Sequence, residues 1–448
     1  MNTIDTERAL DAIRQHLQDG NVDNAVLLIE SLLPPDQADV FEALTREEQI
    51  ELLPALDVDQ AADILEQMTD QDAAQLATQV DAQALASIID QMESDEAADL
   101  LGDLELAQTA DTLAHMSGAD DIRPLLVHSD ESAGGRMVTD FWAFPQTMRV
   151  QDVLSTMRLA GQRVLEIPRL YITDNERHLL GEVSIYHLLR ATPEATLASL
   201  MDTNIVTTHV GDDQEVAARL MLRYGLEAVP VVNDENCLVG VITADDLADI
   251  LEQEATEDIH RIGGSLPMPQ PYLRINIGQH VKRRAGLLIL LLLMMALASP
   301  VINLFEAQLA EAIVLTFFIP MLMGTGGNAG SQTIATIVRA LAVGDVGMGD
   351  ALHVLWRELR TALILGVLLA LVAFPIALIW GSPRVGLAVS VSVLIVVIWG
   401  NVLGTILPLI AARLNLDPAL VSGPLLTTII DVTALLIYFS IAALILNL

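Results

Sequence analysis

The residues best able to do chemistry lie in the last apolar stretch, residues 418–448, which reads PALVSGPLLTTIIDVTALLIYFSIAALILNL. This stretch is long and apolar enough to cross a bilayer, yet Asp431 lies near its middle. A carboxylate at bilayer depth costs about 2.5–3.5 kcal/mol, so it must face a partner or a water-filled path. No basic residue within the stretch can pair with it. We expect Asp431 to bind a cation in a pathway; a hydrogen bond to a neighbouring helix is the alternative.

Further oxygen atoms near Asp431 can complete a cation site. Thr427 and Thr428 lie one helical turn earlier and offer hydroxyl groups. Gly423 and Pro424 interrupt the helix below them, and such a break can free backbone carbonyls where they line a cavity. Oxygen ligands without Cys or His suit a hard cation such as Mg²⁺ or Ca²⁺.

The element carrying Asp431 is the last of five apolar segments, which span about 286–305, 309–333, 361–381, 386–411 and 419–446. Lys282, Arg283 and Arg284 precede the first segment and mark a cytoplasmic boundary. The other basic residues favour the second and fourth connections, with Arg339, Arg357, Arg360 and Arg413, over the third, with Arg384. The positive-inside rule then predicts a multi-pass protein of the cell (inner) membrane, with a cytoplasmic N-terminus and an extracytoplasmic C-terminus.

Two other apolar segments carry small or polar residues. The second contains GTGGNAGSQ at 324–332, and glycine-rich backbone at this depth must line a cavity or be buried in protein. Gly327 and Asn328 are therefore candidates for lining a pathway. The fourth contains Gly400, Asn401 and Gly404, a spacing that permits close helix contact. We expect Asn401 to line the pathway, with helix packing alone as the alternative.

The rest of the chain is acidic. Seven of the 59 acidic residues and five of the 23 basic residues follow position 285, so the first 285 residues carry 52 acidic and 18 basic residues. This charge argues against nucleic acid as a partner and favours a surface that attracts cations; a solubilising surface is the alternative. Cys237 is the one cysteine, so no intrachain disulfide can form. The polar, acidic N-terminus does not resemble a secretory signal.

A twelve-residue repeat begins at Leu56 and runs five times. Alanine occupies the seventh place of each unit, at Ala62, Ala74, Ala86, Ala98 and Ala110. We expect each unit to form one short helix, too short to be stable alone, so that stacked units bury a shared stripe as a helical solenoid. We expect the acidic residues of the repeat to point outward: Asp59, Asp63, Asp70, Asp90, Glu93, Asp95, Glu96 and Asp99.

The middle of the chain contains two related α/β units. Residues 171–191 and 231–251 both read as strand, turn, strand and helix, and each follows an amphipathic helix, at 150–161 and 213–225. This pattern resembles a tandem cystathionine-β-synthase (CBS) domain pair, and the resemblance implies a regulatory module. Many such pairs bind adenine nucleotides through the Asp of a Thr/Ser-x-x-Asp turn. The second unit keeps it at Asp246, whereas the first has His187. An adenine nucleotide at the CBS pair therefore stays open as a partner, and we assign no nucleotide as a cofactor.

An acidic helical run follows the second unit. Asp246, Asp249 and Glu257 are spaced so that they share one helical face. Like charges one turn apart destabilise a bare helix, and bound cations would relieve the repulsion. A solvated acidic helix is the alternative.

Taken together, the chain resembles the MgtE family of magnesium channels and transporters. The resemblance rests on motifs in the apolar half: Pro320 with Gly327-Asn328-Ala329-Gly330-Ser331-Gln332, Gly404 with Pro408, Pro424 with Thr427 and Thr428, and Asp431-Val432-Thr433. The order of acidic helical region, CBS pair, connecting helix and five apolar segments matches over the full chain.

This resemblance implies a homodimer in membrane lipid, with Asp431 binding hydrated Mg²⁺ in a pore between the protomers. It also implies that cytosolic Mg²⁺ binds between the acidic domains and closes the channel. The residues at the matching sensor positions are Asp95, Asp213, Glu215, Asp246, Asp249, Glu254, Glu257 and Asp258. Mg²⁺ is then both cargo and regulator.

We therefore expect a multidomain membrane protein with an all-α superhelical N-terminal domain, an α/β tandem CBS pair and an α-helical transmembrane domain of five helices. The expected boundaries are 1–130 for the helical repeat, 131–199 and 200–254 for the CBS units, 255–284 for the connecting helix and linker, and 285–448 for the membrane domain. Two other functions stay open: a secondary transporter for Co²⁺ or Ca²⁺, and a membrane-anchored nucleotide sensor. No motif for a nucleophile and base, a phosphate loop or a catalytic metal indicates an enzyme.

Overall fold

The computed structural model describes residues 3–159, 167–267, 275–414, 416–420 and 423–447. The chain divides into two units, Met1–Glu252 and Gln253–Leu448.

The first unit begins with a series of short helices. Before the repeat come α1 (Thr3–Gln18), α2 (Val22–Glu30), α3 (Pro34–Ala43) and α4 (Arg46–Leu52). The repeat itself forms α5 (Val58–Gln67), α6 (Asp70–Ala77), α7 (Ala82–Ile89), α8 (Ser94–Gly102) and α9 (Leu106–His115), and α10 (Ala119–Ile122) follows. The prediction of one short helix per twelve residues is therefore confirmed.

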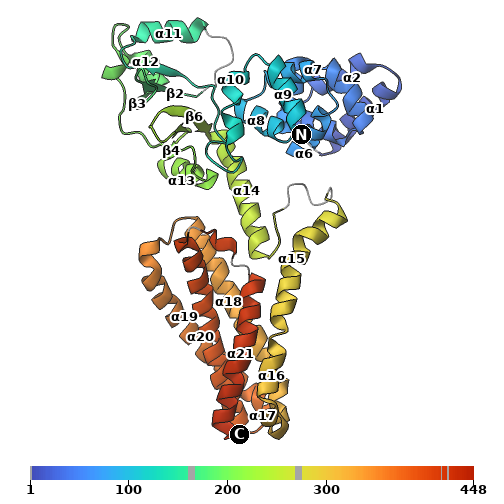
Figure 1. Ribbon diagram of the computed structural model, residues 1–448, viewed down its shortest axis with the longest axis vertical. Helices are drawn as coiled ribbons and strands as arrows, with labels where there is room; N and C mark the ends of the chain where they lie inside the picture. The colour runs from blue at the N-terminus through green and yellow to red at the C-terminus, as the bar shows by residue number, and fades with distance from the viewer. Residues whose placement is uncertain (1–2, 160–166, 268–274, 415, 421–422, 448) are drawn as a thin grey trace. The chain divides into compact units, whose positions relative to one another are not determined.

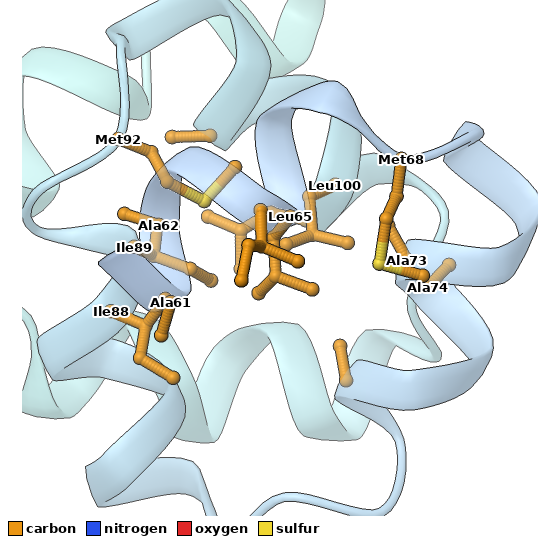
Figure 2. Close-up of a cluster of buried hydrophobic side chains, with 14 of the residues drawn as sticks. Ala61, Ala62, Leu65, Met68, Ala73, Ala74, Ile88, Ile89, Met92 and Leu100 are labelled. Carbon is orange, nitrogen blue, oxygen red and sulfur yellow. The ribbon is translucent and has the colours of Figure 1, made fainter. Parts of the chain in front are cut away.

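Each repeat helix packs against the next but one along the chain: α5 contacts α7, α6 contacts α8, and α7 contacts α9. Figure 2 shows the shared apolar interior, where Leu65 and Leu100 lie among small side chains and Met68 and Met92 flank them. Four of the five repeat alanines are buried, because a small side chain allows two helices to approach closely; Ala110, in the last repeat, is exposed.

The two α/β units have the same topology, as their sequence pattern predicts. The first contains β1 (Ala143–Pro145), α11 (Val150–Leu159), β2 (Arg169–Thr173), β3 (Leu179–Ser184) and α12 (Ile185–Arg190). The second contains β4 (Thr208–His209), α13 (Gln214–Tyr224), β5 (Ala228–Val232), β6 (Leu238–Thr243) and α14 (Ala244–Ile262). In each three-stranded sheet the first strand pairs parallel with the second, and the second pairs antiparallel with the third.

The second unit, Gln253–Leu448, contains five helical spans long and apolar enough to cross a membrane: Ile277–Leu304, Ile313–Ala342, Met348–Trp380, Pro383–Arg413 and Gly423–Leu446. Their helices are α15 (Ile277–Met295) with α16 (Ala298–Leu304), α18 (Ile319–Ala342), α19 (Ala351–Trp380), α20 (Pro383–Arg413) and α21 (Gly423–Leu446), and α17 (Glu306–Glu311) lies between the first two spans. The number of spans agrees with the sequence prediction. The helices α18, α20 and α21 contact one another, and α19 packs on α20 (Figure 1).

The glycine-rich stretches join α18 to α20 almost backbone to backbone. A Cβ added to Gly400 would lie 2.7 Å from the carbonyl oxygen of Gly326, and one added to Gly404 would lie 2.7 Å from that of Gly330. The predicted close contact is confirmed, and α18 remains a continuous helix through this stretch. Ile430 of α21 lies at the same place, since its Cδ1 would be 2.5 Å from a Cβ on Gly330.

Candidate metal sites

Asp431 lies in the middle of α21 and is half-buried. Among the residues that the structure describes, no hydrogen bond or ion pair is made to its carboxylate. Its Oδ1 lies 3.9 Å from the position that a Cβ on Gly327 would occupy, so the α18 backbone is its near neighbour. An unpaired carboxylate beside a helix backbone that lacks side-chain bulk can accept hydrogen bonds from a hydrated cation.

The two threonines one turn earlier are already hydrogen bonded. Thr427 and Thr428 each donate from Oγ1 to the carbonyl oxygen of Pro424 at 2.9 Å, and Thr427 Cγ2 would lie 3.2 Å from a Cβ on Gly327. Each hydroxyl keeps lone pairs that can accept from bound water. The helix interruption expected at Gly423 and Pro424 is the start of α21 itself.

The two asparagines differ in their surroundings. Asn328 is exposed on α18 in the single chain. Asn401 is only 3% exposed: its Nδ2 donates to Val397 O at 2.8 Å, and its Oδ1 accepts from Thr333 Oγ1 at 2.6 Å. The Asn401 side chain therefore ties α20 to α18, which corresponds to the packing alternative rather than to a lining role.

Trp399 is a residue near this site that the sequence reasoning missed. Its indole Nε1 donates to Thr433 Oγ1 at 2.9 Å and so joins α20 to the turn of α21 that carries Asp431. A tryptophan in an apolar helix gives no signal of such a partner before the helices are assembled.

A second candidate site lies in the first unit, around α8. Asp95 is 3% exposed, and its Oδ1 has no hydrogen-bond partner among the described residues. Burial raises the pKa of Asp95, and so does the charge of the nearby Asp246, in the first turn of α14. Asp246 Oδ2 accepts from the Thr243 backbone N–H at 3.0 Å and from its hydroxyl at 2.7 Å.

The expectation that the acidic residues of α8 point outward is wrong. Asp95 is buried, and Glu93, Glu96 and Asp99 are half-buried. The segment after the repeat covers this face: Thr139 N donates to Ser94 Oγ at 2.8 Å, and Arg136 reaches Asp99 at 3.6 Å. Arg136 also supplies a basic neighbour that the repeat itself lacks.

Burial of these acids raises their pKa values strongly. Burial, with the charges of Glu66 and Asp246, raises the pKa of Glu93 to about 7. Burial and the Asp99 charge raise the pKa of Glu96 to about 8, although Arg136 opposes this. Burial likewise raises the pKa of Asp99 to about 7, and burial raises that of Asp95 well above its usual range.

A divalent cation would stabilise the ionised forms of this acid group. Its donor set is carboxylate oxygen, with one oxygen buried and without a partner. This set fits Mg²⁺ or Ca²⁺. Glu93, Glu96 and Asp99 were missed as site residues because an acidic repeat does not reveal which of its faces becomes covered.

The other predicted sensor residues lie on two helices. Asp213 caps α13, accepting from Glu215 N at 2.9 Å, and Glu215 pairs with Arg219. Asp249 is exposed on α14, in the first unit. Glu254, Glu257 and Asp258 lie on the part of α14 that belongs to the second unit, where Glu257 pairs with Arg261. These assignments remain predictions.

Comparison with known proteins gives three family matches. Residues 32–130 match the MgtE intracellular N domain, residues 197–253 match the CBS domain, and residues 319–441 match the MgtE divalent cation transporter family. With five apolar spans, the chain thus belongs to the class of multi-pass divalent cation transporters that carry a CBS domain.

Individual relatives agree with this class. The chain is 36% identical over 327 residues to the magnesium transporter MgtE of Thermus thermophilus, covering 73% of each chain. It is 33% identical over 320 residues to that of Bacillus subtilis, covering 71% of this chain and 70% of the relative. The chain belongs to the MgtE family of magnesium transporters, which are transporters rather than enzymes.

Solved structures match a little more than half of the chain. The soluble part of a magnesium transporter is similar with a TM-score of 0.50 and 26% identity, over 56% of this chain and 99% of that chain. The cytosolic domain of the Mg²⁺ channel MgtE in complex with ATP is similar with a TM-score of 0.51 and 26% identity, over 54% of this chain and 99% of that chain.

Proposed function

We propose that this protein is a magnesium-selective channel that cytosolic Mg²⁺ closes. The observation that carries the pore assignment is Asp431, a carboxylate in the middle of an apolar helix with no partner among the described residues. Such a group at bilayer depth requires a cation or a water-filled path. The named relatives transport magnesium, which supports Mg²⁺ as the ion.

Mg²⁺ holds its water molecules tightly, so a pore for it reads the hydrated ion. In a homodimer within the lipid of the cell membrane, two copies of Asp431 would accept hydrogen bonds from the water shell. Asn328 supports a pore between two copies, since an exposed amide at this depth needs water or a second protein surface. Thr427, Thr428 and the backbone at Gly327 and Gly423 would complete the lining.

The test of the pore is Asp431→Asn, which keeps the shape of the side chain and removes its charge. We expect Mg²⁺ flux into proteoliposomes to fall at least tenfold, since a charge–cation contact at low dielectric is worth more than about 1.4 kcal/mol. Asp345→Asn is the matched control, an exposed acid outside the spanning helices, and should leave flux unchanged. Parental flux in Asp431→Asn would show that Asp431 is not the pore site.

We attribute gating to the acid group around α8, which comprises Glu93, Asp95, Glu96 and Asp99 with Asp246 near them. Burial and repulsion from neighbouring carboxylates raise the pKa values of Glu93, Asp95 and Asp246, so these carboxylates resist ionisation together in the absence of a divalent cation. Mg²⁺ would offset the repulsion between their ionised forms by binding between them in place of protons. The resulting compaction would act through α14 on the membrane helices. We place the N-terminus in the cytoplasm, so that this acid group senses cytosolic Mg²⁺.

Ion current in inside-out patches, with Mg²⁺ titrated on the cytosolic face, tests the gating. Current that falls as Mg²⁺ rises supports both the pore and the sensor. Current indifferent to Mg²⁺ would show that the acid group has no role in gating. Uptake of Co²⁺ or Ca²⁺ without current and dependent on pH would favour a coupled transporter, and absence of all flux would favour a membrane-anchored sensor.

One adenine nucleotide is a second candidate ligand, because a similar MgtE cytosolic domain has been solved in complex with ATP. Asp246 would bind the ribose with its Oδ1, since its Oδ2 already accepts from Thr243. We expect one ATP per chain rather than two, because the first unit has His187 at this position. Equilibrium dialysis with labelled ATP, compared with Asp246→Ala, tests this stoichiometry.

A further inference from the structure

The C-terminal end of α14 meets the beginning of α21 within the second unit. The Arg261 guanidinium pairs with Glu257, one turn earlier on the same helix, and with Asp417, just before the turn that leads into α21. The Arg261 and Asp417 side chains are each 29% exposed, and that of Glu257 is 16% exposed. Arg261 therefore lies between two carboxylates, one on α14 and one in the segment that precedes α21.

Asp417 also accepts a hydrogen bond within its own segment. Its Oδ1 accepts from the Ala419 backbone N–H at 2.8 Å, while its Oδ2 takes the Arg261 contact. Ala419 is fully buried. If Asp417 released Arg261, the guanidinium, which is mostly buried, would keep one of its two carboxylate partners, Glu257.

The residue after Arg261 makes apolar contacts with α21. Ile262 packs on a buried cluster made of Ile334, Val338, Ala419, Leu426 and Ile430. Ile430 is the residue before Asp431 in sequence. A Cβ added to Gly423, the first residue of α21, would lie 3.5 Å from Ile262 O, so the end of α14 covers the start of α21.

Gly264, two residues after Ile262, also lies at this contact. Its φ of +75° is in the left-handed region, where glycine is favoured. A Cβ there would lie 2.8 Å from Leu287 Cδ2 of α15 and 3.2 Å from Pro424 Cγ of α21. The Arg261 ion pair, the apolar contacts of Ile262 and the turn at Gly264 thus hold the end of α14 against the beginning of α21 and the segment before it.

We infer that Arg261 is a positioning residue that fastens the end of α14 to the segment preceding α21, the helix that carries Asp431, through its ion pair with Asp417, while Glu257 on α14 holds the same guanidinium. The ion pair between Arg261 and Asp417 uses the protein's own cation and needs no Mg²⁺. Movement of α14 is passed to α21 because the two helices are tied at this point. The consequence for gating rests on the function proposed above, whereas the attachment itself does not.

The attachment can be measured by the accessibility of a thiol under Ile262. Cys237→Ser with Gly423→Cys places one thiol at this contact, where a Cβ meets its neighbours at ordinary van der Waals distance. The full chain in nanodiscs is treated with a bulky polar maleimide. Loss of an ion pair of this exposure is worth about 1 kcal/mol at most, so Arg261→Gln and Asp417→Asn should each raise the labelling rate about threefold.

A double-mutant cycle separates the ion pair from general loosening. Arg261→Gln combined with Asp417→Asn should label no faster than either variant alone, and Arg261→Lys should stay near the parent. The control Arg413→Gln removes an exposed arginine at the end of α20 and should change nothing. Labelling of Arg261→Gln at the parental rate, or additive effects in the double variant, would overturn the inference.

Mg²⁺-dependent flux then tests the coupling. Arg261→Gln should keep the maximal flux at low Mg²⁺ and require about threefold more Mg²⁺ to close, whereas a purely structural defect would lower the maximal flux. Faster labelling with an unchanged midpoint would overturn the coupling role. If the parent's flux ignores Mg²⁺, the proposed gating fails, and the labelling rates still decide the attachment.

Discussion

Mg²⁺ binding to the acid group around α8 should release protons at neutral pH. At a pKa of about 7, roughly half of the Glu93 and Asp99 side chains carry a proton at pH 7, and at about 8 roughly nine-tenths of Glu96 do. Because metal ligands must be ionised, full occupation would release roughly two protons per chain from these three groups. Burial also raises the pKa of Asp95 well above its usual range.

The assay is addition of Mg²⁺ to weakly buffered, metal-free protein at pH 7 in the presence of an indicator dye. Glu96→Gln should reduce the release by roughly one proton, while the exposed-acid control Glu51→Gln should not change it. At pH 9 the release should nearly vanish, because these three groups are already ionised. Saturable Mg²⁺ binding without proton release at pH 7, or with equal release at both pH values, would refute the reasoning.

Three further predictions concern stability. The raised pKa values of Glu93, Glu96 and Asp99 make the native state bind more protons than the unfolded chain between about pH 4 and pH 8. The metal-free protein should therefore become less stable as pH rises through this window. Thermal unfolding in chelator at pH 6 and pH 8, compared with unfolding in Mg²⁺, checks this. Gly400→Ala places a Cβ 2.7 Å from Gly326 O and should cost about 1–3 kcal/mol, measured by unfolding in detergent beside Gly349→Ala, which meets nothing within 4 Å. Asp90→Ala removes the acceptor of the Ser117 N–H at 2.8 Å and should cost about 1–2 kcal/mol, with Asp90→Asn recovering part; equal unfolding midpoints for Asp90→Ala and the parent would contradict this.

Local periodicity explains why so much of the fold could be predicted. The alanine at every twelfth place fixes which side of each short helix meets its neighbours, and the strand–turn–strand–helix pattern fixes each small sheet. The apolar spans follow from length and composition alone. None of these signals depends on residues far away in the chain.

The contacts that escaped prediction join distant segments. Asn401 was expected to line a pathway because it is an amide in an apolar helix, and its role changed once Thr333 on another helix was found to donate to it. Likewise, α8 could be assigned as a helix from its own repeat, but Arg136 and Thr139, which cover its acidic face, belong to a later segment without the repeat. Periodicity shows which side chains lie on each face of one helix, whereas the residues that contact those side chains are known only once the helices are assembled.

The contact of Gly326 and Gly330 with Gly400 and Gly404 also has an evolutionary consequence. At each of the four positions a single methyl group would meet backbone or side chain at 2.4–2.7 Å. At Gly400 and Gly404 the nearest atom is a backbone carbonyl oxygen of α18, so no side chain can be trimmed to make room, whereas at Gly326 and Gly330 it is a methyl group of Val396 or Ile430. Descendants of this sequence can vary the outer surfaces of α18 and α20 residue by residue, whereas Gly400 and Gly404 can change only together with a shift of one whole helix away from the other.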